Sequence, residues 1–171
     1  MADFAESLAL QIPRLRRYAR ALTHDVTRAD DLVQDTLERA LRRRWLFRIN
    51  SNLTAWLFTM LYRLYLNDAL RQPLVYMESE GLPDIAGSED PGVQLDMQRA
   101  LGRLTPEHRA VIVLVGLEQL SYKETAEVLN IPVGTVMSRL MRAREQLRHL
   151  LSDVPSSPPV AATPAQLTRI K

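Results

Sequence analysis

The sequence predicts an all-α fold made of two small helical domains joined by a flexible acidic linker. Apolar residues recur at helical spacing, and runs of alternating β-branched residues are absent. Prolines and glycines gather between residues 73 and 92, which divides the 171-residue chain into two blocks. The last twenty residues carry four prolines and no core pattern. We therefore expect domains at 1–72 and 99–151, a linker at 73–98 and a disordered tail at 152–171.

The charge changes sign at the same boundaries. Residues 1–72 hold 12 arginines and 8 acidic residues, residues 73–98 hold 6 acidic residues and no base, and residues 99–151 hold 8 bases and 5 acidic residues. Two basic blocks around an acidic segment favour two contacts with a polyanion, nucleic acid above all. Two solvated domains with an ordinary acidic linker give the same pattern, so charge alone leaves both interpretations open.

The first block predicts three helices. They are expected at residues 4–23, 28–44 and 53–71, with a fourth if the first helix breaks, and a polar loop at 45–52. The second of them has an apolar stripe and an acidic opposite face at spacings of three and four. The stripe consists of Leu32, Val33, Thr36, Leu37, Ala40 and Leu41.

The second block predicts a helix-turn-helix. A helix is expected at 96–104, and Thr105 with Pro106 then gives an N-cap and a first helical position. Ser121 and Glu124 have the spacing of a capping box at the start of a short helix. The last helix follows a tight turn, runs to about residue 151 and is basic, as in DNA-binding helix pairs.

The last helix has one apolar side and one polar side. Leu140, Ala143 and Leu147 lie within about 40° of Val136, because each residue advances the helix by about 100°. The opposite side and its shoulders can offer base and phosphate contacts to a major groove. An exposed amphipathic helix with ordinary surface arginines is the alternative. The predicted duplex-contacting residues are Lys123, Thr135, Ser138, Arg139, Met141, Arg142 and Arg144.

Several classes of protein are disfavoured. The chain has no cysteine, three scattered histidines and no glycine-rich phosphate loop, so we predict no catalytic residue, metal site or cofactor. It has neither a secretory signal nor an apolar run near the roughly 18 residues that cross a bilayer. A cytoplasmic protein without membrane contact of its own is expected.

Three segments together resemble the small extracytoplasmic-function type of bacterial RNA polymerase sigma factor, within the sigma-70 family. They are ADDLVQDTLERAL at 29–41, LTAWLFTMLYRLYLNDALR at 53–71 and the stretch from 104 to 147 that contains IPVGTVMSRLMRARE. The resemblance covers residues 8–151. It implies a region 2-like domain that binds core polymerase and recognises and melts the minus-ten element. It also implies a region 4-like domain that reads the minus-thirty-five element, in a transcription initiation factor that is not an enzyme.

The resemblance also assigns partners and residues. The acidic face of the second helix would meet the clamp coiled coil of the largest polymerase subunit, and the second domain would meet the flap. Promoter DNA would be bound both as duplex and as melted non-template strand. An anti-sigma factor and a stress response are further implications. The polymerase-binding residues would be Asp30, Asp31, Gln34, Asp35 and Glu38, and the minus-ten residues Asn50, Ser51, Asn52, Tyr62 and Arg63.

Four positions depart from the family pattern. Many relatives have Asn in place of Arg63, Asp in place of Asn67, a basic residue in place of Met137, and His or an aromatic residue in place of Met141. Two other functions stay open at this point. One is a dimeric helix-turn-helix regulator that binds duplex DNA alone. The other is a sigma-like decoy, which the basic face of the last helix disfavours.

Overall fold

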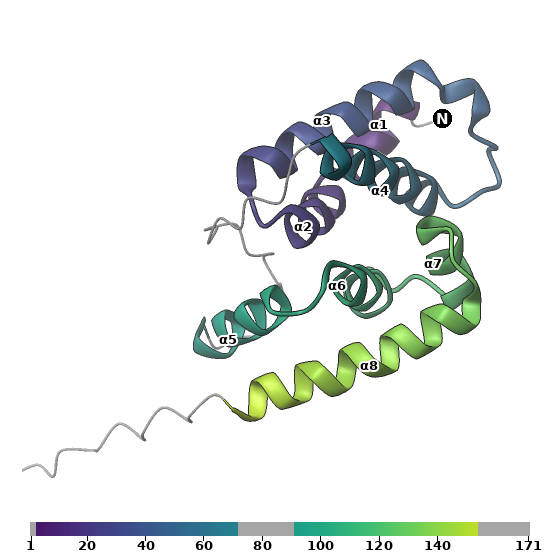
Figure 1. The fold of residues 1–171 in the computed structure, drawn as a ribbon. Helices are drawn as coiled ribbons and strands as arrows, with labels where there is room; N and C mark the ends of the chain where they lie inside the picture. Colours follow the sequence, from purple (N-terminus) through teal and green to yellow (C-terminus); the bar gives the residue numbers. More distant parts are fainter. Residues whose placement is uncertain (1–2, 72–90, 154–171) are drawn as a thin grey trace, which may run out of the picture.

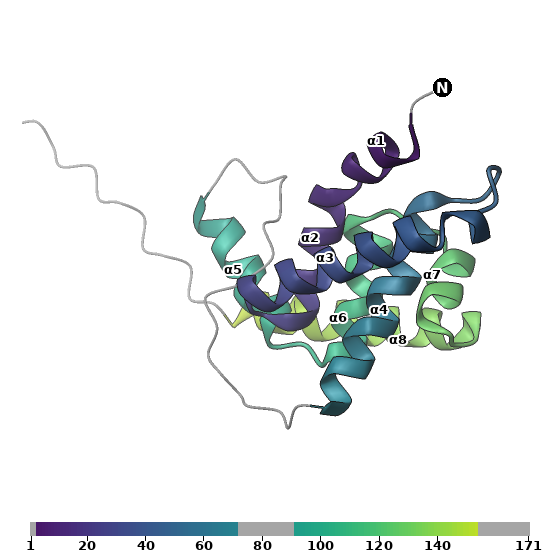
Figure 2. The same cartoon turned by 90° about the horizontal axis from the view of Figure 1, so that it is seen from above.

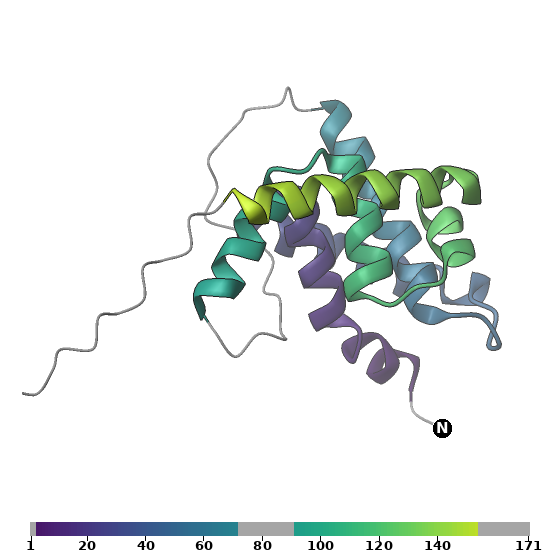
Figure 3. The same cartoon turned by 90° about the horizontal axis from the view of Figure 1, so that it is seen from below.

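The computed structural model describes residues 3–71 and 91–153. Most of the predicted linker and tail therefore lies outside the described residues. In the described part every regular element is a helix, as the sequence predicted, and no strand occurs. Figures 1 to 3 show these helices from three directions.

The first block contains α1 (Phe4–Ala9), α2 (Ile12–Thr23), α3 (Val26–Arg42), the short 3₁₀-helix η1 (Arg44–Leu46) and α4 (Leu53–Arg71). The predicted first helix is broken between α1 and α2, where Pro13 stands in the first turn of α2. Asp25 caps α3, since its carboxylate accepts a hydrogen bond from the Arg28 N–H.

The second block contains α5 (Pro91–Gly102), α6 (Pro106–Ile112), the π-helical turn η2 (Val113–Leu117), α7 (Tyr122–Leu129) and α8 (Val133–Ser152). Helix α5 begins five residues before the expected position, within the segment predicted as linker. The two predicted caps are confirmed. Thr105 accepts a hydrogen bond from the His108 N–H, and Ser121 and Glu124 form both halves of a capping box.

Each block has an apolar interior. In the first, Tyr18 of α2 packs on Phe58 of α4 with ring centroids 5.0 Å apart, and Leu15 and Leu61 are fully buried beside them. In the second, the predicted stripe of α8 faces inward, and the Val136, Leu140 and Ala143 side chains are buried. Apolar burial of this kind stabilises helices too short to persist alone.

The two blocks pack directly against one another. Helix α2 contacts α6, and α4 contacts α7, so that buried side chains of both blocks join in a single apolar cluster. Figure 1 shows α6 and α7 lying between the first block and α8. Helix α8 crosses the outer side of this layer, as the view from below in Figure 3 shows.

Candidate nucleic-acid and polymerase interfaces

Helix α8 presents most of the predicted duplex-contacting residues to solvent. Asn130 ends α7 in the left-handed conformation, with φ of 54°, and Pro132 precedes α8, so the chain turns sharply between the two helices. Met137 and Met141 are 50% and 66% exposed, and Lys123, Arg142 and Arg144 are also exposed. The described α8 thus carries a basic outer face with two apolar thioether side chains.

Three predicted residues of this surface are only half-exposed: Thr135, Ser138 and Arg139. The Ser138 hydroxyl donates a hydrogen bond of 3.1 Å to the carbonyl of Thr135, within the first turns of α8. Arg139 lies near the first block, where its charge acts on the Tyr62 phenol and opposes the rise of its pKa. The two sets of predicted DNA-contacting residues therefore approach one another here.

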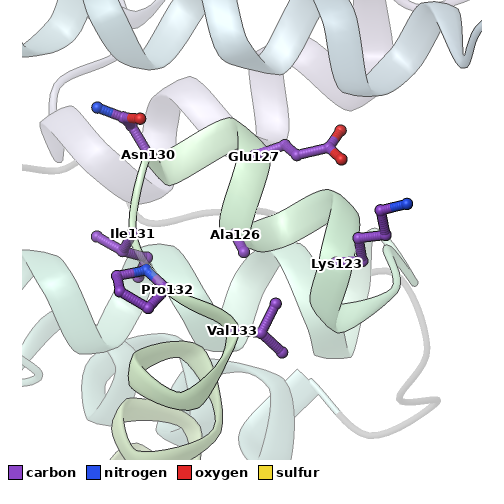
Figure 4. A pocket seen from close by; sticks show the side chains of 7 residues that line it. All are labelled: Lys123, Ala126, Glu127, Asn130, Ile131, Pro132 and Val133. Carbon is purple, nitrogen blue, oxygen red and sulfur yellow. The ribbon is translucent and has the colours of Figure 1, made fainter.

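A groove of about 490 Å³ lies beside the helix-turn-helix turn (Figure 4). Ile131, Pro132 and Val133 form one wall, while Lys123 and Glu127 extend from α7 on the other side. The two charged residues have opposite signs, so the groove has no dominant charge. Its position next to the first turn of α8 places it at the edge of the predicted duplex-contacting surface.

The predicted minus-ten loop leads from η1 into α4. Asn50 and Ser51 are exposed, and the Ser51 hydroxyl donates to the Arg48 carbonyl at 2.7 Å. Asn52 is engaged at both ends of its amide. Its Oδ1 accepts from the Ala55 N–H at 3.2 Å, and its Nδ2 donates to Oε1 of Glu124 at 2.6 Å. Asn52 thus caps α4 and joins the loop to α7.

Aromatic side chains near this loop are packed to different degrees. Phe47 stands 5.3 Å from Trp56 and 5.8 Å from Phe4 between ring centroids, so these three rings support one another. Tyr62 is half-buried, and burial raises its pKa. Trp45 is 76% exposed. The sequence reasoning did not select Trp45, although a bulky ring beside a polar loop is a signal for base stacking.

The predicted polymerase-binding face of α3 is open to solvent. Asp31, Gln34, Asp35 and Glu38 are exposed, whereas Asp30 is half-buried and pairs with Arg16 at 3.3 Å. Such partly solvated carboxylates steer an encounter with a basic partner more than they add affinity.

Along the same side of α3, a groove of about 360 Å³ separates it from α4. Asp31 and Asp35 belong to its lining, and Arg28 crosses it to pair with Asp68 at 2.8 Å. The groove therefore carries both signs of charge directly beside the acidic face.

A buried carboxylate joins the two blocks. Glu118 has a side chain with no exposed surface, and it is held by two arginines of α2. Nε of Arg14 donates to its Oε2 at 2.7 Å, and Nε of Arg17 donates to its Oε1 at 2.6 Å. Nη2 of Arg14 also donates to the backbone carbonyl of Glu118 at 2.7 Å. We refer to these three residues as the Glu118 cluster.

A second polar contact between the blocks comes from Arg109 of α6, which is 4% exposed. Its guanidinium donates to the carbonyls of Leu101 at 3.0 Å and Leu104 at 2.7 Å in its own block, and to the Ala21 carbonyl of α2 at 2.9 Å. Its charge lies close to His24. Burial first, and the Arg109 charge second, lower the pKa of His24 from 6.5 to about 4.

Sequence reasoning found neither the Glu118 cluster nor the Arg109 contact. Both join residues about 90 to 100 positions apart, and a single sequence contains no signal for such pairs. Two further findings concern only the part of the chain that the structure describes. None of its helices combines the length and apolar character needed to cross a bilayer, and it contains no cluster of acidic and histidine side chains suited to a metal ion.

Comparison with family models divides the chain in the same way. Residues 8–62 match the model described as the Sigma2 domain of PhyR, and residues 94–147 match Sigma-70, region 4. The chain is 35% identical over 151 residues to the ECF RNA polymerase sigma factor EcfG of Rhodopseudomonas palustris, which covers 85% of this chain and 83% of that protein. It is 30% identical over 173 residues to the ECF RNA polymerase sigma factor SigW of Bacillus subtilis, covering 88% and 90%.

Solved structures give the same relationship. The sigma factor RpoE of Bartonella quintana, in complex with the anti-sigma factor NepR, aligns with a TM-score of 0.77 and 34% identity. That alignment covers 91% of this chain and all of the other. CnrH, in complex with the cytosolic domain of CnrY, aligns with a TM-score of 0.66 and 28% identity over 89% of each chain.

Proposed function

The chain belongs to the extracytoplasmic-function family of RNA polymerase sigma factors, and we propose that it acts as one: it binds core RNA polymerase and directs promoter-specific initiation of transcription. The observation that carries this function is the succession of a Sigma2 match and a region 4 match along a single chain. The relatives named above align with this chain over most of their length.

For promoter recognition, we propose that the outer face of α8 reads the minus-thirty-five element as duplex DNA. Exposed Arg142 and Met141 suit contacts with base edges, while Arg144 and Lys123 suit phosphates. Thr135, Ser138 and Arg139 complete the set when the second block separates from the first. The melted non-template strand of the minus-ten element would meet the other set, Asn50, Ser51, Asn52, Tyr62 and Arg63.

For polymerase binding, we propose that the exposed carboxylates of α3 meet the basic clamp coiled coil of the largest subunit, and that the second block meets the flap. Residues 1–72 would act as the region 2-like domain, 73–98 as the linker, 99–151 as the region 4-like domain and 152–171 as a tail. On this proposal the protein works in the cytoplasm, without a cofactor, and melts DNA through binding energy and not through covalent chemistry.

For control, we propose that an anti-sigma factor holds the protein out of transcription until a stress signal releases it. RpoE of Bartonella quintana, which resembles this chain over its whole length, was solved with the anti-sigma factor NepR. Similar packing of the two blocks makes a similar partner reasonable here.

Binding to purified core polymerase tests the proposal. The wild-type chain should bind tightly, and Asp31→Lys with Asp35→Lys should lose binding, because two lysines then replace exposed carboxylates of α3 and repel the basic clamp. Glu6→Lys with Glu127→Lys is the matched control, since it makes the same charge change at exposed positions outside α3. A folded wild-type sample that failed to bind would contradict the proposal and return attention to a stand-alone DNA-binding regulator.

A further inference from the structure

We propose that Arg14 and Arg17 of α2 form a binding site for the phosphodiester backbone of single-stranded promoter DNA, and that Glu118 occupies this site while the two blocks are packed together. The proposal rests on the function proposed above and extends it. It adds a nucleic-acid contact to a helix that neither predicted DNA-contacting set includes.

The geometry of the Glu118 cluster is that of an anion site. One guanidinium holds each oxygen of the carboxylate, at 2.7 Å from Arg14 and 2.6 Å from Arg17. The two non-bridging oxygens of a phosphodiester present the same kind of paired acceptors. Arginine is the side chain best suited to such oxygens, because its planar guanidinium donates several hydrogen bonds in fixed directions.

The first block itself holds Arg14 in position. Nη1 of Arg14 donates to the Thr54 hydroxyl at 3.1 Å, and that hydroxyl donates to the Gln11 amide oxygen at 2.8 Å. The Arg14 guanidinium also lies 5.8 Å from the centroid of the Phe58 ring. These contacts do not involve the second block, so they remain when Glu118 moves away. The Arg14 half of the site is therefore already formed when the blocks separate.

The position of the cluster points to promoter DNA as the ligand. Thr54, which touches Arg14, stands in the first turn of α4, directly after the predicted minus-ten loop. In the same packed state Glu124 accepts a hydrogen bond from Asn52 of that loop. Glu118, just before α7, and Glu124, within α7, thus bind neighbouring parts of the first block. Helix α7 lies against α4 in Figure 1.

The consequence is a competition. DNA and Glu118 cannot hold the same guanidinium groups, so a strand that binds them favours the separated blocks, and the packed state weakens DNA binding. While Glu118 binds Arg14 and Arg17, their guanidinium groups are not available to another anion. In the packed structure the side chains of Arg14 and Arg17 are 34% and 26% exposed. Separation of the blocks makes both fully available to the nucleic acid.

Two full-length variants separate this proposal from a purely structural contact. One variant is Glu118→Gln, and the other combines Arg14→Gln with Arg17→Gln. Each removes the ion pairs of the Glu118 cluster, so each should loosen the blocks. A dye pair on Thr27→Cys and His149→Cys, in a chain without other cysteines, reports the separation as a fall in energy transfer. The probe for binding is a short fluorescent single-stranded oligodeoxynucleotide, titrated at several salt concentrations.

The two variants should affect DNA binding in opposite directions. Glu118→Gln should bind the oligonucleotide about fivefold more tightly than wild type, since it exposes the arginines. Arg14→Gln with Arg17→Gln should bind about tenfold more weakly than Glu118→Gln. Its plot of log affinity against log salt should also be shallower by about 1.4, which is two phosphate contacts at roughly 0.7 each on a single strand.

Two controls match the charge changes. Glu127→Gln removes an exposed carboxylate of α7, and Arg99→Gln with Arg103→Gln removes two exposed arginines of the second block. Neither should reproduce these changes. If the double glutamine variant fails to fold, Arg14→Lys with Arg17→Lys keeps the charge but loses the directed donors, and it should still bind more weakly than Glu118→Gln.

The proposal is overturned if both cluster variants loosen the blocks and change DNA binding by the same factor, or if neither changes it. Binding of the wild-type chain to core polymerase, measured in parallel, reports on the proposed function separately. If the chain binds polymerase but Arg14 and Arg17 do not contribute to DNA binding, only the anion-site proposal fails and the proposed function stands.

Discussion

At the scale of single residues, two buried charged side chains decide how the blocks meet. Glu118 is satisfied by two guanidinium groups and Arg109 by carbonyl oxygens from two parts of the chain. A buried charge is tolerated only with such partners, because it has lost its water. These hydrogen bonds therefore constrain how the two blocks meet.

Replacing Arg109 with Met should destabilise the protein by about 2–4 kcal/mol, because the buried carbonyls that accept its hydrogen bonds lose their donor. Urea unfolding measures the change in free energy. Arg103→Met, at an exposed position, should stay within about 0.5 kcal/mol of wild type. Equal effects of the two variants would contradict the role given to Arg109.

His24 should make the stability depend on pH. Its pKa of about 4 in the folded state lies below the ordinary value of 6.5, so folding favours the neutral ring. Its contribution is fully present above about pH 6.5 and is lost as the pH falls toward 4. The free energy of unfolding should fall less over this range in His24→Asn than in wild type. Asparagine is a suitable replacement because it tolerates the φ of 53° at this position.

At the scale of elements, the ends of α7 and the outer face of α8 lie closest to the proposed DNA contacts. The capping box at Ser121 orients the start of α7, and its Glu124 also reaches Asn52. Hydrogen bonds from Ser121 and from Asn52 lower the pKa of Glu124, so this carboxylate stays ionised. A cap therefore doubles as a contact between blocks.

Ser121→Ala should destabilise the protein by about 1 kcal/mol, since the Glu124 N–H loses the hydroxyl that accepts its hydrogen bond at 3.1 Å. Amide hydrogen exchange should accelerate first in the opening turn of α7. Ser152→Ala is a suitable control, because Ser152 ends α8 and its hydroxyl donates only to the Arg148 carbonyl in the same last turn. Unchanged exchange in α7 would contradict the assignment.

Helix α8 should distinguish base contacts from phosphate contacts. In reconstituted polymerase, Arg142→Ala should relax the preference at one position of the minus-thirty-five element, with a loss of roughly 1–3 kcal/mol for the preferred base. Arg144→Ala should weaken all sequences alike and reduce the salt slope by about 0.9. Selection from a randomised promoter library, followed by salt titration, measures both.

At the scale of the whole molecule, the two blocks share an apolar cluster as well as polar contacts. The same interface half-buries Tyr62 and engages Asn52, both predicted to contact the minus-ten strand. If these residues act as proposed, a protein that holds two separated promoter elements gives up this packing first. On the proposed function, the packed arrangement would restrain promoter binding.

Cleavage between the blocks should leave them associated. With a protease site inserted after residue 83 of the full chain, the two fragments should elute together in gel filtration, because the shared core and the Glu118 cluster remain. After the same cleavage, the fragments of the Glu118→Gln variant should dissociate at a higher protein concentration than the wild-type fragments. Immediate separation of the wild-type fragments would contradict the importance given to the interface.

Local signals explain how much of the fold the sequence predicted. Helical spacing predicted the buried stripe of α8, where Val136, Leu140 and Ala143 are indeed buried. Cap chemistry predicted the starts of α6 and α7 at Thr105 and Ser121. The start of α5 was missed by five residues, since Pro91 belongs to a proline-rich segment that also opens a helix.

By itself, the sequence determined the helices, their caps, the separation of charge and the family, because each depends on residues close together in the chain. It also indicated the candidate contacts of α3 and α8, whose exposure follows from helical periodicity. Only the tertiary structure decided which of these residues are free and which are engaged. Glu118 meets Arg14 across 104 positions and Asn52 meets Glu124 across 72. Such pairs form where the packing of the two blocks brings distant surfaces together, and no local pattern encodes which surfaces will meet.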